Sequence, residues 1–135
     1  MDKQVVIEKV KAAISNSCGM EIDTIKPEST LFDDLAITSI DMVDILYMLE
    51  TEFNISLKIS DIENESRGEL NGAPFEIDNV ITAEGLDAIK RKVPEIPGDK
   101  LKPGLTIHEI VNLITVEILA NMVLFKIQQQ EITQK

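Results

Sequence analysis

Aromatic residues are scarce in this chain: of its 135 residues none is Trp, four are Phe and one is Tyr. A core with so few rings must be built mainly from Ile, Leu, Val and Met, and this composition favours helices packed on helices. The length fits one domain with one core, without a metal or a disulfide framework to make folding possible.

Cysteine and histidine occur once each, as Cys18 and His108. A single thiol excludes an internal disulfide, and no apolar run is long enough for a membrane span, so we expect a cytoplasmic protein. A hydrolase triad would need His108, which has no sequence cue that pairs it with Ser or Cys. We therefore expect no catalysis by this chain, a packing role for Cys18 and a surface helical position for His108.

The sequence also lacks the spacing of common metal and phosphate sites. Asp33, Asp34, Asp41 and Asp44 do not follow the alternating ligands and central Gly of a calcium loop. Zinc ligands are missing, and no Gly-rich phosphate loop follows a strand. We predict no metal site.

Basic residues are in the minority, with 13 against 24 acidic ones and a formal net charge of −11. Such a charge repels nucleic-acid phosphates and anionic lipid surfaces. We expect no nucleic acid as a partner, no stable membrane insertion, and partners that present basic surfaces.

Helical spacing of apolar residues predicts a first helix over about Asp2 to Ser17, with a buried stripe of Val6, Val10, Ala13 and Ile14. Gly19 supplies a stop signal. The segment from Ile22 to Thr38 is then expected to be an ordered loop, anchored in the core by Ile25, Leu31, Phe32 and Leu35.

A second helix is predicted to open at Thr38-Ser39, where either hydroxyl can cap it, and to run to about Phe53 or Asn54. Its core side is expected to hold Met42, Leu46, Leu49 and Phe53, flanked by Val43 and Ile45. The opposite side collects Asp41, Asp44, Met48, Thr51 and Glu52. This mixture suits an adaptable, charge-steered contact, although periodicity alone leaves an ordinary solvated face as an alternative.

Turn residues interrupt the segment at about 58–103, in which only one short helix is predicted, capped by Thr82 and ending near Lys92. Leu86 and Ile89 should face inward, and Lys90, Arg91 and Lys92 form the only basic cluster. We expect the segment to be an ordered layer, with apolar contacts from Leu70, Phe75, Ile77, Val80, Ile81, Leu86, Ile89 and Val93.

The last helix is predicted to begin at Thr106, where Thr106 and Glu109 match a capping box, and to continue to about Gln128. One apolar stripe should pack on the first two helices and consists of Ile107, Ile110, Ile114, Ile118, Met122 and Phe125. The other should be covered by the 58–103 segment and consists of Val116, Leu119 and Val123.

Ser39 is the residue best placed to carry chemistry. It opens an acidic amphipathic helix directly after the loop Phe32-Asp33-Asp34-Leu35-Ala36-Ile37-Thr38. A hydroxyl at that position is exposed, and nearby backbone N–H groups suit a phosphodiester. The residues alone leave open that Ser39 or Thr38 only caps the helix.

The run Leu31-Phe32-Asp33-Asp34-Leu35-Ala36-Ile37-Thr38-Ser39-Ile40-Asp41, continued by Val43, Asp44, Leu49-Glu50 and Glu52-Phe53, resembles the acyl carrier proteins. The resemblance covers about Asp2 to Leu57 and the final helix. It implies an all-α fold, an acyl-carrier-like helical bundle with a partly helical insert at about 58–103 between helix two and the last helix. We expect 1–135 to form a single acyl carrier domain and a monomer.

The same resemblance implies a site and a cofactor. Ser39 would carry covalent 4′-phosphopantetheine, whose thiol holds acyl intermediates as thioesters. The acidic helix would dock partner enzymes through Asp41, Asp44, Met48 and Glu52. Those partners would be a phosphopantetheinyl transferase and acyl-loading, acyl-transfer or synthase enzymes with basic docking surfaces.

Three positions depart from the family pattern: Thr38 stands where Asp is usual, Ala36 where Gly is common, and Ile40 replaces Leu. The long insert resembles specialised long bacterial acyl carriers, which implies a role in specialised fatty-acid or lipid biosynthesis. Two alternatives stay open: a carrier for polyketide or aminoacyl intermediates, and an unmodified protein-binding adaptor with the same fold.

Overall fold

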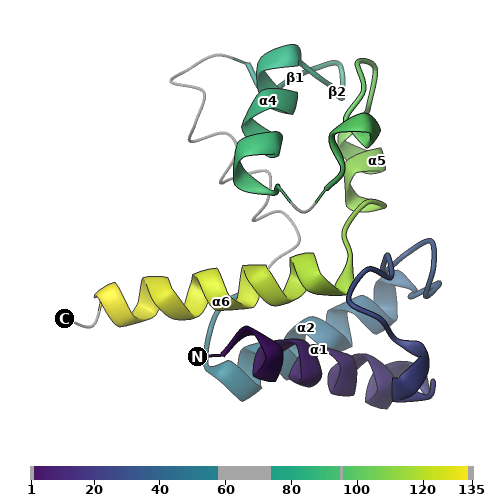
Figure 1. The fold of residues 1–135 in the computed structure, drawn as a ribbon, viewed down its shortest axis with the longest axis vertical. Helices are drawn as coiled ribbons and strands as arrows, with labels where there is room; N and C mark the ends of the chain where they lie inside the picture. Colours follow the sequence, from purple (N-terminus) through teal and green to yellow (C-terminus); the bar gives the residue numbers. More distant parts are fainter. Residues whose placement is uncertain (1, 58–73, 95, 134–135) are drawn as a thin grey trace. The chain divides into compact units, whose positions relative to one another are not determined.

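The computed structural model describes residues 2–57, 74–94 and 96–133, apart from the side chains of His108 and of residues 131–133. Contacts divide the chain into two compact units. Unit 1 comprises Met1–Lys58 and Thr115–Lys135, and unit 2 comprises Ile59–Ile114. The elements of both are drawn in Figure 1. The predictions for Leu70 and for the His108 side chain lie outside the described residues.

The described part of unit 1 contains three long helices and one short one: α1 (Lys3–Cys18), η1 (Ile22–Thr24), α2 (Ser39–Phe53) and α6 (Val116–Thr133). α1 packs on both α2 and α6. The predicted stripe of α1 is buried, together with Ile7. Asp2 caps α1, because its Oδ1 accepts a hydrogen bond from the Gln4 N–H at 3.0 Å, and Gly19 ends it with φ 70°.

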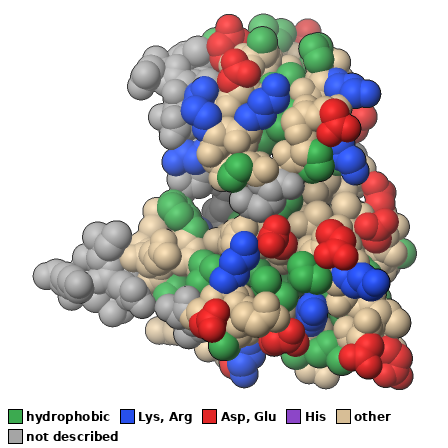
Figure 2. Space-filling view, viewed as in Figure 1, with side chains coloured by type: hydrophobic (Ala, Val, Ile, Leu, Met, Phe, Trp, Pro, Cys, Tyr) green, Lys and Arg blue, Asp and Glu red, His purple; other side chains and the backbone are tan. Residues whose placement is uncertain are grey.

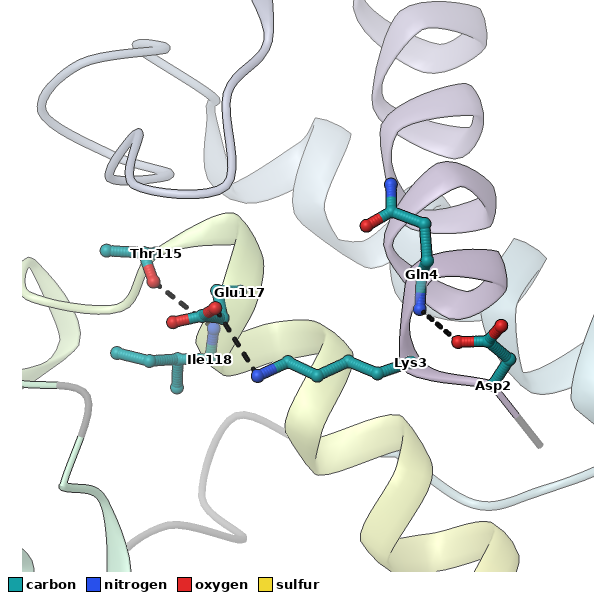
Figure 3. A network of polar contacts seen from close by, with 6 residues as sticks. All are labelled: Asp2, Lys3, Gln4, Thr115, Glu117 and Ile118. Atoms are coloured by element: carbon teal, nitrogen blue, oxygen red, sulfur yellow. Dashed lines mark hydrogen bonds and ion pairs between the residues drawn. The ribbon is translucent and has the colours of Figure 1, made fainter.

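Polar contacts mark the neighbouring starts of α1 and α6 (Figure 3). Lys3 Nζ lies 3.3 Å from Glu117 Oε2, and Thr115 Oγ1 accepts a hydrogen bond from the Ile118 N–H at 3.2 Å. Because the ion pair is largely exposed, it adds at most about 1 kcal/mol. Burial of apolar side chains from both helices, including Val6 and Leu119, supplies most of the stabilisation.

Unit 2 contains β1 (Glu76–Ile77), β2 (Val80–Ile81), α4 (Ala83–Lys92), η2 (Gly98–Lys100) and α5 (Ile107–Val111). The strands pair antiparallel, with Glu76 opposite Ile81 and Ile77 opposite Val80. Asp78 and Asn79 connect them with φ values of 52° and 70°, as a two-residue turn of type I′ requires. The hairpin is tied to the later chain, since the Ile81 N–H donates to Leu105 O at 2.8 Å.

The predicted short helix is confirmed as α4. Thr82 caps it by accepting a hydrogen bond from the Gly85 N–H at 3.0 Å, and both Leu86 and Ile89 are buried. Its basic residues are exposed, and basic side chains gather over α4 in Figure 2. Ile77 and Val80 were expected to supply apolar contacts for the segment, but both are exposed and pair with each other next to the turn of the hairpin.

The prediction of a single last helix was also wrong, because the chain forms two helices there, α5 and α6 (Val116–Thr133). The capping box of Thr106 and Glu109 is present and starts α5, but that helix ends at Val111. Thr115 then makes a new N-terminal cap for α6. The expected single stripe is therefore divided between the units, and Phe125 near its end is exposed. Cover of the second stripe by the insert stays a prediction.

The fold class is confirmed as helical, with the two-residue strands as the only sheet in the described ranges. The extra partly helical region includes α4 and α5. Within those ranges, no helix combines the length and apolar character needed to cross a membrane.

Gly85 offers a test of whether unit 2 is packed as described. A Cβ added there would lie 2.5 Å from Phe75 O and 2.8 Å from Ile81 Cγ2. Since the backbone carbonyl cannot turn aside, we expect Gly85→Ala to destabilise the unit by about 1–3 kcal/mol. Amide exchange at Leu86 and Ile89 should then accelerate by roughly 5- to 150-fold.

Gly98→Ala is the matched control, because an added Cβ there meets nothing within 4 Å. It should leave exchange at Leu86 and Ile89 close to the wild-type rate. Equal exchange in both variants, or fast exchange at these amides in the wild type, would show that the packing around Gly85 is not formed.

Candidate functional site

Ser39 is the first residue of α2 and is exposed. Its hydroxyl makes no hydrogen bond within the described residues. Thr38, one residue earlier, caps the helix by accepting a hydrogen bond from the Asp41 N–H at 3.1 Å. The capping role therefore belongs to Thr38, and the Ser39 hydroxyl stays available for chemistry.

This helix start fits a phosphodiester on Ser39. The N–H groups of Ser39 and Ile40 have no partner within the helix, so they are available to phosphate oxygens. Fifteen residues of aligned peptide dipoles add a partial positive charge at the same end. In the described part of the chain, no group of three or more His, Cys, Asp or Glu residues is arranged to hold a metal ion.

The loop before Ser39 is held by buried apolar residues. Ile25 and Leu31 are buried as predicted, Phe32 and Leu35 are half-buried, and Ile37 is buried in addition. Ala36 has φ 52°, a left-handed conformation that costs an L-residue roughly 1–2 kcal/mol relative to the right-handed one. This explains in physical terms why glycine suits the position of Ala36.

Two of the predicted docking residues lie beside the end of α1. Asp44 Oδ2 accepts a hydrogen bond from Ser17 Oγ at 3.0 Å, and the same hydroxyl lies 3.5 Å from the Asp41 backbone oxygen. Asp44 is exposed and Asp41 is half-buried. The two carboxylates thus form one acidic edge near Ser39.

The other two predicted docking residues lie farther along α2. Glu52 is exposed and its Oε1 lies 2.9 Å from Lys9 Nζ, so its charge is partly balanced. Met48 is half-buried. At 1.5 Å per residue, Glu52 is about 20 Å along the helix from Ser39.

The sequence interpretation missed an exposed apolar stripe on α2. Ile40 is 82% exposed, Val43 69% and Tyr47 67%. Val43 was expected beside the core, but the buried side is centred on Met42, Ile45 and Leu49, which turns Val43 to the surface. The spacing i, i+3, i+7 from Ile40 was the available signal, because it places the three side chains on one face.

Cys18 contacts the acidic edge. Burial raises the pKa of its thiol, and the charge of Asp41 and a hydrogen bond to that residue raise it further, with a smaller effect of Asp44. The raised pKa keeps the thiol protonated and weakly nucleophilic at neutral pH. Cys18 is therefore suited to packing, as expected from the sequence.

Removal of the charge at Asp41 should make Cys18 more reactive. Asp41→Asn lowers the pKa of the thiol, so at pH 8 we expect alkylation by iodoacetamide to accelerate roughly two- to fivefold. Asp44→Asn, the matched control, should have a smaller effect because Asp44 contributes least to the shift. The alkylation rate is measured by intact mass. A larger acceleration in Asp44→Asn than in Asp41→Asn would contradict this arrangement.

Comparison with known proteins gives the family. Residues 8–70 match the family model described as "Phosphopantetheine attachment site". An acyl carrier protein of Clostridium acetobutylicum is 39% identical over 62 residues, which cover 46% of this chain and 80% of that protein. The chain belongs to the acyl carrier protein family. Its members act as carriers rather than enzymes, and their attachment domain bears covalent 4′-phosphopantetheine.

Two further relatives support the same family. The acyl carrier protein of Thermotoga maritima is 33% identical over 64 residues, covering 47% of this carrier and 79% of the relative. Acyl carrier protein AcpXL of Mesorhizobium japonicum is 40% identical over 52 residues, which cover 38% of this chain and 56% of that relative. The family match ends at residue 70, so α4, α5 and α6 lie beyond it.

Proposed function

We propose that this carrier bears 4′-phosphopantetheine on Ser39 and holds acyl intermediates for specialised fatty-acid or lipid biosynthesis. The observation that carries the proposal is the exposed hydroxyl of Ser39 at the start of α2, inside the segment that matches the attachment family. When attached, the group supplies a thiol on a flexible arm, which raises the effective concentration of the bound acyl group at each partner.

Thr38 is the main feature that supports the alternative of an unmodified adaptor, but it is also compatible with modification. Its Oγ1 accepts the hydrogen bond that an Asp carboxylate would accept at the same cap, and Thr and Asp are both favoured there. The substitution therefore removes a charge but keeps the geometry that presents Ser39. A transferase that depends on the cap geometry can still use this chain.

We propose that partners dock on the exposed side of α2. Of the predicted residues, Asp41, Asp44 and Glu52 supply its acidic border and Met48 adds an apolar side chain. Ile40, Val43 and Tyr47 supply an apolar centre. Apolar centres with charged borders are typical of protein interfaces, in which charge steers the encounter and burial holds the complex. The partners would be a phosphopantetheinyl transferase and acyl-loading, acyl-transfer or synthase enzymes with basic surfaces.

We further propose that residues 1–135 act as one monomeric carrier domain in the cytoplasm, where the unpaired Cys18 stays reduced. Unit 2 supports a specialised pathway, because it adds α4 and α5 beyond the segment that matches the family model. In this proposal the insert serves a dedicated acyl chain or partner.

The cargo on the protein purified from its own organism tests the pathway. Release of the thioester and mass analysis should yield a fatty acyl group. A polyketide or aminoacyl group would replace the lipid assignment with the alternative carrier function. A chain without phosphopantetheine, isolated from cells that express a transferase, would instead support the adaptor.

A further inference from the structure

The loop that leads to Ser39 is attached at its beginning to the start of α6. Ser29 O accepts a hydrogen bond from the Val116 N–H at 3.0 Å, and Pro27 O accepts one from the Glu117 N–H at 2.9 Å. Thr30 forms an antiparallel bridge with Thr115. Up to Thr30, the loop is therefore fixed to a helix of the bundle.

After Thr30 the chain turns, and two reciprocal hydrogen bonds close the turn. Asp34 Oδ2 accepts from the Thr30 N–H at 2.9 Å, and Thr30 Oγ1 accepts from the Asp34 N–H at 2.9 Å. The Leu35 N–H also donates to Thr30 O at 3.1 Å. Thr30 is half-buried and Asp34 is exposed. The Asp34 carboxylate therefore binds a backbone N–H although solvent is available to it.

The turn leads to the proposed attachment residue, Ser39. The Ile37 N–H donates to Leu31 O at 3.0 Å, and both of these side chains are buried. Ile37 is followed directly by Thr38, the cap of α2, and then by Ser39. We propose that Thr30 and Asp34 are positioning residues, which hold the loop that presents Ser39 to the phosphopantetheinyl transferase.

This inference rests on the proposed attachment at Ser39. It predicts a change in the KM of the transferase for the carrier without a change in kcat. We call the turn closed when both hydrogen bonds between Thr30 and Asp34 are formed. If the transferase binds only carriers with a closed turn, the apparent KM for the carrier is the intrinsic KM divided by the fraction of carrier in that state. The chemical step begins after binding, so kcat should stay unchanged. Loss of one hydrogen bond across the turn lowers the closing equilibrium constant by about three- to tenfold, so KM should rise by up to about tenfold.

Variants of Asp34 separate the hydrogen bond from the charge. Asp34→Ala removes both, whereas Asp34→Asn keeps an oxygen that accepts from the Thr30 N–H and removes only the charge. Asp33→Ala is the matched control, because Asp33 is an exposed neighbouring carboxylate with no hydrogen bond or ion pair in the described part of the chain. Thr30→Val and Thr30→Ser form the corresponding pair at the other end of the contact.

The full-length chain is assayed with coenzyme A and a transferase that modifies the wild type, with KM and kcat determined by intact mass. We expect a higher KM and an unchanged kcat for Asp34→Ala and Thr30→Val, and near wild-type values for Asp34→Asn, Thr30→Ser and Asp33→Ala. Amide exchange, which needs no transferase, should accelerate by about three- to tenfold at Leu35 and Ile37 in Asp34→Ala.

Three results would overturn the positioning role. They are an unchanged KM in Asp34→Ala, an equal rise in KM in Asp34→Asn, and unchanged amide exchange at Leu35 and Ile37 in Asp34→Ala. Failure of the attachment itself is distinguishable, because the wild type would then gain no mass with any transferase while the exchange measurement still tests the turn.

Discussion

Ser39→Ala is expected to abolish phosphopantetheinylation completely. The substitution removes the oxygen that would form the phosphodiester, while the capping hydroxyl of Thr38 stays in place. Ala is also the best helix former, so the free energy of unfolding should change by less than about 0.5 kcal/mol. Intact mass after incubation with coenzyme A and a transferase measures the loss directly.

Thr51→Ala is the matched control for this experiment, because Thr51 carries an exposed hydroxyl on the same helix, α2, near its other end. It should be modified at close to the wild-type rate. If Ser39→Ala still gained the mass of the arm, another residue would be the acceptor and the site would be wrong.

Charge reversal at Asp41 and Asp44 should slow association with partner enzymes by about tenfold or more at low salt. The two carboxylates lie near Ser39 at the border of the exposed apolar stripe, where they can steer a basic partner surface. With both reversed to Lys, the remaining rate should depend less steeply on ionic strength. Association rates measured by stopped flow across a salt series test this.

The control reverses Glu84 and Asp87 on α4, which changes the net charge by the same amount. These carboxylates are also exposed, and Glu84 likewise lies in the first turn of its helix. This variant should retain most of the wild-type rate. An equal decrease of the association rate in both variants would mean that the net charge of the chain sets this rate, and that the α2 face has no special role.

Local rules predicted most of unit 1 correctly. Caps and stops are side-chain and glycine signals that act within a few residues, so the stop at Gly19 and a capping hydroxyl at Thr38 or Ser39 were predicted from the sequence. The buried stripe of α1 follows from its 3.6-residue period. Asn54 ends α2 with φ 55°, close to the predicted boundary.

The outward face of α2 could not be predicted as reliably, because its rotation is decided by tertiary packing. Met42, Ile45 and Leu49 are buried against the bundle, and this rotation exposes Val43. A helix with apolar residues around most of its circumference gives no unique core side by periodicity alone. For this reason the exposure of Ile40 and Tyr47 was missed, although they lie on the same helix as the predicted attachment residue Ser39.

The break between α5 and α6 was missed for a related reason. Apolar residues continue through Ile114 and Val116 with helical spacing, so periodicity suggested one helix. Thr115 instead pairs with Thr30 and caps α6, and the pairing depends on a loop distant in the sequence. The adjacent β-branched residues, which lower helix propensity, were the available local signal.

The most direct test of the central claim is to locate the modification on the protein purified from its own organism. Proteolysis followed by tandem mass spectrometry should find 4′-phosphopantetheine on the peptide that contains Ser39, with the added mass on that side chain. A peptide with unmodified Ser39 throughout, or the arm attached to a different residue, would contradict the account.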